Sequence, residues 1–239
     1  MKRVIAICIF VMAAFVAVAQ ENTTAEQVVS LPKTDWLMPF DKVKVVGPMN
    51  VVFKRVQSPE EVRITYDTKG NITSKFKFEV DKKGALVVSE KMDSKRTTVT
   101  DITIYYNSLV DVKITHAKAE FADRVECPLF DLLVSGGAMV TLDIKTLDAA
   151  VECTGVSRLT LSGSTKYLTM RVSTAKADCT KLSVVSATID ALHSAELRLT
   201  VSERLDATIS TGAKLLYKGH PIILRDHTQA FGGEIININ

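Results

Sequence analysis

Apolar and polar residues alternate between residues 110 and 221, and the alternating segments recur about every twenty residues. Six segments begin at Val110, Phe130, Leu147, Leu168, Thr188 and Leu205. Five have apolar residues at the first, third and fifth places: Val110/Val112/Ile114, Phe130/Leu132/Val134, Leu147/Ala149/Val151, Leu168/Met170/Val172 and Leu205/Ala207/Ile209. The segment at Thr188 is weaker, since Asp190 takes its third place and Leu192 its fifth. A small residue follows at each eighth place: Ala117, Gly137, Thr154, Ala175, Ala195 and Gly212.

Alternation with a period of two predicts β-strands, and recurrence near twenty residues predicts that the strands stack as coils. Each coil of such a solenoid buries its inner face against the next coil. We therefore predict an all-β protein, a right-handed parallel β-helix (solenoid) with coils of about 17–21 residues. The small eighth place is expected at a corner, where a larger side chain would crowd the next coil. No apolar stripe with the helical period of about 3.6 residues is present, so almost no helix is expected.

The first residues of the chain predict export. A basic start at residues 1–3 is followed by an apolar run, Val4–Ala19, whose last three residues form a small-residue cleavage pattern. We interpret residues 1–19 as a secretory signal peptide, because the run is shorter than the roughly 20 residues of a membrane-spanning helix. After its removal we expect no integral membrane span and a location in the periplasm, on the outer-membrane surface or outside the cell.

The remaining chain divides into four parts. Residues 20–36 are polar and lack periodicity, which predicts a loosely ordered linker. Residues 37–108 alternate in short segments between Gly, Pro and Asp turn residues, and predict a β-rich N-terminal portion continuous with the solenoid. The β-helix repeats are placed at residues 109–225, and residues 226–239 are expected to form a C-terminal cap or tail.

The charge of the chain gives no case for a nucleic acid partner. Without Lys2 and Arg3, the count of Lys and Arg falls from 30 to 28 against 27 Asp and Glu, which leaves a net charge of +1. A near-neutral exported chain lacks the basic surface that nucleic acid or anionic lipid requires.

The cysteines give no sign of a framework or a metal site. Cys127, Cys153 and Cys179 are odd in number and widely spaced, unlike disulfide frameworks or zinc sites with their close pairs. We expect buried thiols, and a bridge between Cys153 and Cys179 on neighbouring coils stays open.

Several strands of the repeat region are followed by Ser-Gly or a close relative of it. The examples are Val134-Ser135-Gly136-Gly137, Leu161-Ser162-Gly163-Ser164, Val172-Ser173-Thr174 and Ile209-Ser210-Thr211-Gly212. With Phe40–Val45 at the start and Tyr217–Pro221 at the end, this order resembles the GIN domain family of exported bacterial proteins, described as a putative auto-transporter adhesin head. The resemblance covers roughly residues 37–225 and implies a β-helix with a role at the cell envelope or surface. It brings no agreed catalytic residues.

Aspartates recur at the second place of the repeat, as Asp111, Asp131, Asp148 and Asp206, and the first three are expected to stack on successive coils. Like charges directly opposite each other on a sheet are unfavourable, so a basic neighbour, a turn hydrogen bond or a cation has to relieve them. One hypothesis is a calcium site or an acidic patch for a sugar. The favoured interpretation is that each Asp caps a bend through its own backbone.

No catalytic, cofactor-binding or metal-ligating residue is predicted. Ser135, Ser173 and Ser210 lack a Gly-x-Ser-x-Gly context, and no His–Asp pair is placed near them. Their hydroxyls are expected to satisfy backbone groups at the corners. His116 and His193 are expected at solvent-facing corners.

These features favour a binding module over an enzyme. The first hypothesis is a non-catalytic, exported cell-envelope or surface module, an adhesin that binds glycan or protein. The second is a carbohydrate-active β-helix enzyme, like a lyase or glycosidase, that uses the Asp column; such chemistry needs two carboxylates across a cleft, and no such pair is recognisable. The third is a structural, oligomeric envelope element, because exposed solenoid ends invite self-association. No cofactor is expected.

Overall fold

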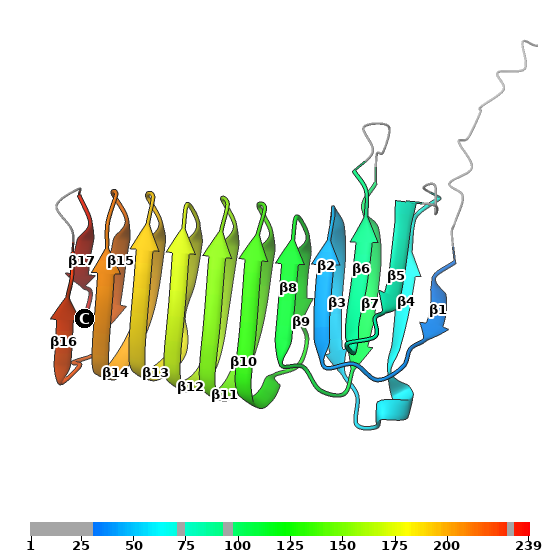
Figure 1. The fold of residues 1–239 in the computed structure, drawn as a ribbon, viewed down its shortest axis with the longest axis horizontal. Helices are drawn as coiled ribbons and strands as arrows, with labels where there is room; N and C mark the ends of the chain where they lie inside the picture. The colour runs from blue at the N-terminus through cyan, green and yellow to red at the C-terminus, as the bar shows by residue number, and fades with distance from the viewer. Residues whose placement is uncertain (1–30, 71–74, 93–97, 229–231) are drawn as a thin grey trace, which may run out of the picture.

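The computed structural model describes four stretches of the chain: residues 31–70, 75–92, 98–228 and 232–239. Strands make up 69% of these residues and stack along one axis as a solenoid of about seven turns (Figure 1). The predicted fold class is therefore confirmed. Helical structure in the described part is confined to short 3₁₀ segments, and this part holds no helix of the length and apolarity that a membrane crossing requires. The predicted signal peptide lies outside the described residues.

The elements of the chain occur in the following order. They are β1 (Lys33–Trp36), β2 (Lys42–Val46), β3 (Met49–Arg55), the 3₁₀ turn η1 (Pro59–Glu61), β4 (Arg63–Asp67), β5 (Phe76–Val80), β6 (Ala85–Glu90), β7 (Thr100–Tyr106), β8 (Asp111–Thr115), β9 (Lys118–Phe121), β10 (Val125–Ser135), β11 (Met139–Thr154), β12 (Arg158–Ser173), β13 (Lys176–Leu192), β14 (Glu196–Ile209), β15 (Lys214–Lys218), β16 (Ile223–Asp226) and β17 (Glu234–Asn237).

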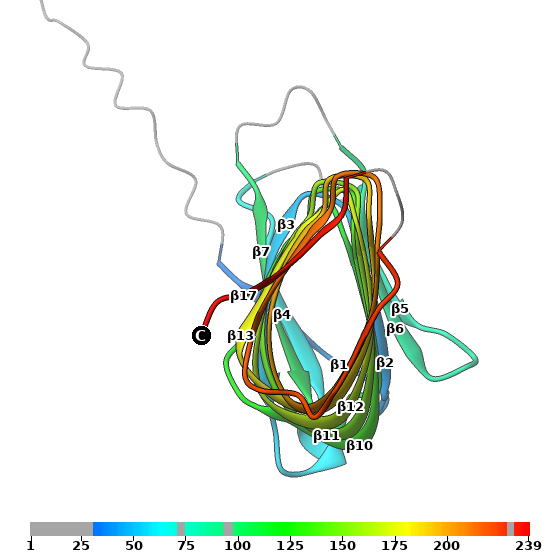
Figure 2. The same ribbon diagram turned by 90° about the vertical axis from the view of Figure 1, so that its left-hand side faces the viewer.

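Each turn of the solenoid crosses two sheets, which form the long sides of a flattened oval in Figure 2. The sheet that faces the viewer in Figure 1 is called the front sheet; it contains β2, β5, β6, β8, β16 and the later parts of β10–β14. The rear sheet contains β1, β3, β4, β7, β9, β15, β17 and the early parts of β11–β14. The long strands β11–β14 thus bend from the rear sheet into the front sheet.

Inward residues of successive coils stack in rows and fill the space between the two sheets. One buried row consists of Phe130, Ala149, Leu168, Ala187 and Leu205. Large and small side chains alternate along this row, so neighbouring coils can interlock at the density of a protein interior. The alternation that predicted the strands is therefore the alternation between this core and solvent.

The segment predicted to start at Leu147 lies in a different register. Leu147 was predicted to face inward but is 51% exposed, and Ala149 takes the place between Phe130 and Leu168. Cys153 is then the fifth-place residue and is fully buried. A shift by two residues leaves every side chain on the same face, so the apolar pattern alone could not separate these registers.

The segment predicted to start at Thr188 begins one residue earlier in the structure. Ala187, Ile189 and Ala191 face the core, whereas Asp190 is part of the outer surface. Ala187 and Ala191, at the first and fifth places, are only weakly apolar. The sequence pattern was therefore assigned one residue too late.

Residues with positive φ turn the chain from the front sheet to the rear sheet. They are His116, Gly136, Gly137, Gly155, Val156, Thr174, His193, Ser194, Thr211 and Gly212. A small buried residue follows in each corner: Ala117, Ala138, Ser157, Ala175, Ala195 and Ala213. Its carbonyl oxygen accepts a hydrogen bond from the next coil, as when Arg158 N donates to Ala138 O at 2.8 Å. The predicted small corner residues Ala117, Ala175 and Ala195 are confirmed as buried. In the other three corners the buried small residues are Ala138, Ser157 and Ala213, in place of the predicted Gly137, Thr154 and Gly212.

The N-terminal coils do not stack in the order of the sequence. Strand β2 pairs with both β6 and β8, and β3 pairs with both β7 and β9. The first coil, β2–β3, therefore lies between two coils that follow it in the chain. Antiparallel strands β1, β4 and β5 complete this end of the solenoid.

Both terminal segments contain a strand. The last four residues of the predicted linker, Lys33–Trp36, form β1, because pairing with β4 satisfies their backbone whatever their side chains; residues 20–30 lie outside the described part. In the predicted C-terminal cap or tail, Glu234–Asn237 form β17, which pairs in parallel with β15 and so extends the rear sheet.

Candidate interaction surfaces

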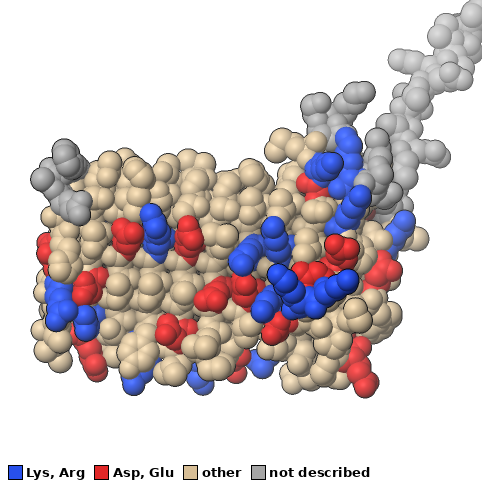
Figure 3. Space-filling view, viewed as in Figure 1, with Lys and Arg blue, Asp and Glu red and all other residues tan. Residues whose placement is uncertain are grey.

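A row of mostly charged side chains, interrupted by one leucine, runs across the coils of the front sheet, whose outer surface is seen in Figure 3. Its successive members are Lys113, Leu133, Glu152, Arg171 and Asp190. The sign of the charge alternates from Glu152 to Asp190, and Arg171 Nε lies 3.7 Å from Asp190 Oδ2. Exposed ion pairs of this kind contribute little to stability, so these charges remain available to a partner.

Two aspartates of the predicted column are neighbours in the structure. Asp111 on β8 and Asp131 on β10 lie directly opposite each other. Their repulsion is relieved by a basic neighbour, since Lys113 Nζ lies 3.2 Å from Asp111 Oδ2. Within the described residues, no three His, Cys, Asp or Glu side chains come together as a metal site.

The prediction that Asp148 stacks on these two aspartates is wrong. Ala150 lies beside Asp131, whereas Asp148 pairs with Tyr167 near the bend. The cause is the same shift by two residues that displaced Leu147. Asp206 is also separate from the aspartate pair. Its neighbour is Thr188, on a coil several coils away from Asp111 and Asp131.

A hollow of about 280 Å³ lies on the front sheet beside the aspartate pair. It forms where the short side chain of Ala150 stands between Asp131 and Thr169. Glu152 and Arg171 also line it, so both signs of charge face the same space. This hollow is where the predicted Asp column could meet a ligand.

Two arginines and one histidine surround Asp206 near the C-terminal end of the front sheet. Asp206 Oδ2 lies 3.0 Å from Arg204 Nη2 and 3.7 Å from Arg225 Nη1, and Oδ1 lies 3.2 Å from His227 Nε2. The hydrogen bond from Arg204, with the charges of His227 and Arg225, lowers the pKa of Asp206. On the rear sheet, Lys176 lowers the pKa of Glu196 in the same way.

We expect these carboxylates to make the solenoid sensitive to acid. Their folded pKa lies below the unfolded value of about 4, so their stabilisation is complete above that value and is lost as pH falls through the folded pKa. Denaturant midpoints should therefore change little between roughly pH 7 and 5 and fall below roughly pH 4. The Asp206→Asn variant should have a shallower acid branch; an identical branch would contradict this account.

Three side chains stack on the outer side of the rear sheet at the N-terminal end. Trp36 on β1, Arg63 on β4 and Tyr105 on β7 are successive cross-strand neighbours. The Arg63 Cζ atom lies 3.7 Å from the centroid of the Tyr105 ring and 5.6 Å from that of Trp36. Trp36 is 68% exposed. The sequence prediction placed Trp36 in the linker and missed this cluster. Lys33–Trp36 has three polar residues before Trp36, so no alternation indicated a strand.

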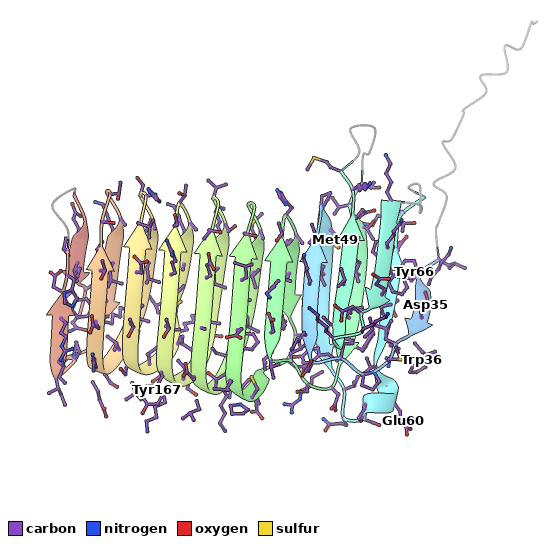
Figure 4. All side chains as sticks on the ribbon, in the orientation of Figure 1. Asp35, Trp36, Met49, Glu60, Tyr66 and Tyr167 are labelled. Atoms are coloured by element: carbon purple, nitrogen blue, oxygen red, sulfur yellow. The ribbon has the colours of Figure 1, made fainter. Side chains whose placement is uncertain are left out.

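A second aromatic cluster lies at the same end, between the two sheets. Tyr66, Phe76 and Phe78 have ring centroids 4.9 to 5.7 Å apart, and they line a cavity of about 660 Å³ together with Lys33. Burial, followed by the neighbouring charge of Asp35, raises the pKa of Tyr66. Figure 4 shows Asp35 and Tyr66 at this end.

The corner between the sheets brings one serine and one histidine together. Ser173 Oγ lies 3.1 Å from His193 Nδ1 on the next coil, a pair that their separation of one repeat could have indicated. In the described part of the chain, no carboxylate forms an ion pair or hydrogen bond with His193 to complete a triad. His116 and His193 are exposed corner residues, as predicted.

The three described cysteines are free thiols. Cys153 and Cys179 are buried and Cys127 is half-buried. Burial raises the pKa of Cys127 to about 11 and that of Cys153 to about 12, and it raises the pKa of Cys179 further. Protonated, buried thiols are poor nucleophiles, in line with a packing role.

Comparison with known proteins places the chain in a family and defines its fold. The family model described as "Putative auto-transporter adhesin, head GIN domain" matches residues 39–221. No curated protein gives a significant match.

Three solved structures of similar fold come from bacteria. A putative adhesin from Bacteroides fragilis has a TM-score of 0.77 at 15% identity, covering 87% of this chain and 96% of its own. A putative adhesin from Parabacteroides merdae has a TM-score of 0.63 at 15% identity, with 86% and 95% covered. A putative lipid binding protein from Parabacteroides distasonis has a TM-score of 0.60 at 15% identity, with 88% and 97% covered. At this identity the likeness shows a shared fold.

Proposed function

The chain belongs to the family described as putative auto-transporter adhesin, head GIN domain, and we propose that it is an exported, non-catalytic module that binds glycan or protein at the cell envelope or surface. The family match spans nearly all coils of the solenoid. The predicted signal peptide at residues 1–19 supports export.

The observation that carries this proposal is the difference in side-chain composition between the inside and the outside of the solenoid. The inward rows are filled by apolar side chains, whereas charged, hydroxyl and aromatic groups lie on two broad outer sheets. Stacked coils repeat outward groups at the interstrand spacing of roughly 4.8 Å. An extended polymer or a protein surface can therefore be contacted at several points at once, which raises avidity.

Binding without turnover is the expected result for the purified mature protein. It should bind glycan arrays or intact cells saturably and release no product from a panel of polysaccharides. Product release that disappears in Asp131→Asn would instead establish the carbohydrate-active alternative, because Asp131 lies in the hollow of the front sheet.

Location can be tested separately from binding. In cells that express the full chain, proteolysis of intact cells and of spheroplasts should find the protein outside the cytoplasmic membrane. Retention of the whole chain in the cytoplasm would contradict the proposal.

A further inference from the structure

We propose that Trp36 and Arg63, with the adjacent threonines of the rear sheet, form a binding site for a neutral glycan. This inference rests on the interaction function proposed above and assigns it a site and a ligand class. The candidate lies at the N-terminal end of the solenoid, where Figure 4 shows Trp36 on the terminal strand.

The strand register fixes the position of each group. Trp36 pairs with Arg63, and Arg63 pairs with Tyr105, so the three lie in one row across β1, β4 and β7. The guanidinium of Arg63 rests on the half-buried Tyr105 ring at 3.7 Å from its centroid. Because β1 pairs only with β4 among the described strands, it is the outermost strand of this sheet. The indole of Trp36 is consequently exposed and held from one side.

A row of hydroxyl groups runs parallel to this aromatic row. Thr34, Thr65 and Thr103 are cross-strand neighbours two residues away from Trp36, Arg63 and Tyr105, and so share their face of the sheet. Thr34 Oγ1 and Thr65 Oγ1 are 3.0 Å apart and hydrogen-bonded.

Arg63 has donors to spare for a ligand. Its Nη1 donates to Glu61 O at 3.0 Å, the one hydrogen bond of this guanidinium within the described residues. A guanidinium carries five N–H donors in a fixed plane. The remaining donors border the exposed indole.

This combination matches the two-sided chemistry of a sugar ring. The C–H face of a hexose can pack on the indole, while its hydroxyls accept hydrogen bonds from Arg63 and exchange them with the threonines. Trp36 and Tyr105 are two strands apart, roughly 10 Å, so the row is long enough for more than one sugar. One guanidinium stacked on a ring binds an anionic group more weakly than several cations that each make bidentate hydrogen bonds. The site therefore favours an uncharged glycan.

The site is largely ordered before a ligand arrives. Backbone pairing fixes the strands, and the cation–π contacts restrict Arg63. Binding then costs less side-chain entropy than at a site of free side chains. Trp, Tyr and Arg are also common at protein interfaces, but here the flanking row is hydroxylic rather than apolar, which favours sugar.

Trp36 supplies its own readout, because it is the only tryptophan of the chain. The full mature chain should be titrated with neutral glucan, mannan and galactan hexasaccharides. For at least one of them, tryptophan emission should shift saturably, and calorimetry should give the same affinity. If none of the three perturbs the emission or gives heat, the neutral-glycan site is overturned.

Variants assign the binding to this surface. Trp36→Ala and Arg63→Gln should each weaken calorimetric affinity about tenfold, since one stacking contact is worth roughly 1.4 kcal/mol. Trp36→Phe should recover part of the loss, because it keeps an aromatic face. The matched control is Tyr167→Ala, which removes another exposed ring beside a cation, with Lys166 Nζ 5.3 Å from its centroid. It should bind like the parent.

The outcomes separate this inference from the broader function. If hexasaccharides or cells are bound equally by the parent and by both site variants, the interaction module stands and the site is wrong. If cells are bound through Trp36 but all three hexasaccharides fail, the surface takes a protein and the glycan assignment is wrong. Circular dichroism of each variant confirms that β structure is retained.

Discussion

Replacing Leu132 with Asp is expected to unfold the coils around it, whereas the same replacement at Leu133 is expected to leave the solenoid folded. Leu132 is 3% exposed and lies between Val112 and Val151 in an inward row. A carboxylate there would be removed from water without a partner, at a cost of several kcal/mol. The buried leucine also contributes about 2 kcal/mol. Together these two costs are a large part of the typical free energy of unfolding of about 5–15 kcal/mol, so the coils around Leu132 should unfold.

The neighbouring leucine is a control with the same chemistry on the opposite face. Leu133 points outward, between Lys113 and Glu152 on the adjacent strands. An aspartate there would be hydrated and would gain one favourable and one unfavourable charge, so a change within about 0.5 kcal/mol is expected. Soluble yield, circular dichroism and denaturant unfolding measure both variants. Equal behaviour of the two, or a larger loss at Leu133, would contradict the assignment of inner and outer faces.

Leu132→Met tests whether the inner row requires shape or only an apolar side chain. A swap of similar volume should cost less than about 1.5 kcal/mol. A collapse of this variant would mean that the row depends on the exact form of leucine rather than on exclusion of charge.

Strand alternation could be predicted from the sequence because it follows burial directly. The set Phe130, Leu132 and Val134 faces the core as predicted. The frame of the next coil could not be predicted, because a displacement by two residues preserves the face of every side chain. Leu147 is apolar but exposed at the bend, and with Ala149 it fitted the repeat pattern in the wrong frame.

No feature of the sequence predicted the order in which the N-terminal coils stack. Strands β2 and β3 pair with neighbours on both sides through generic backbone hydrogen bonds. Any coil with the same inward alternation fits against any other. The pattern therefore predicts that the coils stack, but it does not predict their order along the solenoid. Only the contacts of the whole chain decide this.

The candidate glycan site was missed for a related reason. Trp36, Arg63 and Tyr105 are far apart in sequence and meet only because β4 and β1 add antiparallel strands to the rear sheet. The predicted Asp column, in contrast, was a short-range pattern; it holds for Asp111 and Asp131, whose spacing equals one coil, and fails for Asp148, where the frame was wrong.

Replacing Gly163 with Ala is expected to cost much more stability than replacing Gly137, a corner glycine with open space at its Cβ position. Gly163 lies within β12 with a φ of 104°, and a Cβ there would stand 2.0 Å from Ile144 O on the neighbouring coil. The obstacle is backbone, so it cannot rotate away as a side chain can. Relief requires that the coils separate locally, which breaks hydrogen bonds of the ladder between them. We expect a loss of about 4 kcal/mol or more.

Gly137→Ala separates this clash from the cost of a left-handed backbone alone. Gly137 has a φ of 79° and no heavy atom within 4 Å of a built Cβ, so its replacement should cost about 1–2 kcal/mol. Denaturant midpoints of the two variants measure the difference. If Gly163→Ala lost no more than Gly137→Ala, the carbonyl of Ile144 would have to move freely, and adjacent coils could not be held as closely as their stacked core requires. A large difference would instead show that the close approach of backbone to backbone at this bend contributes to the stability of the solenoid, a contact that only glycine permits at this position.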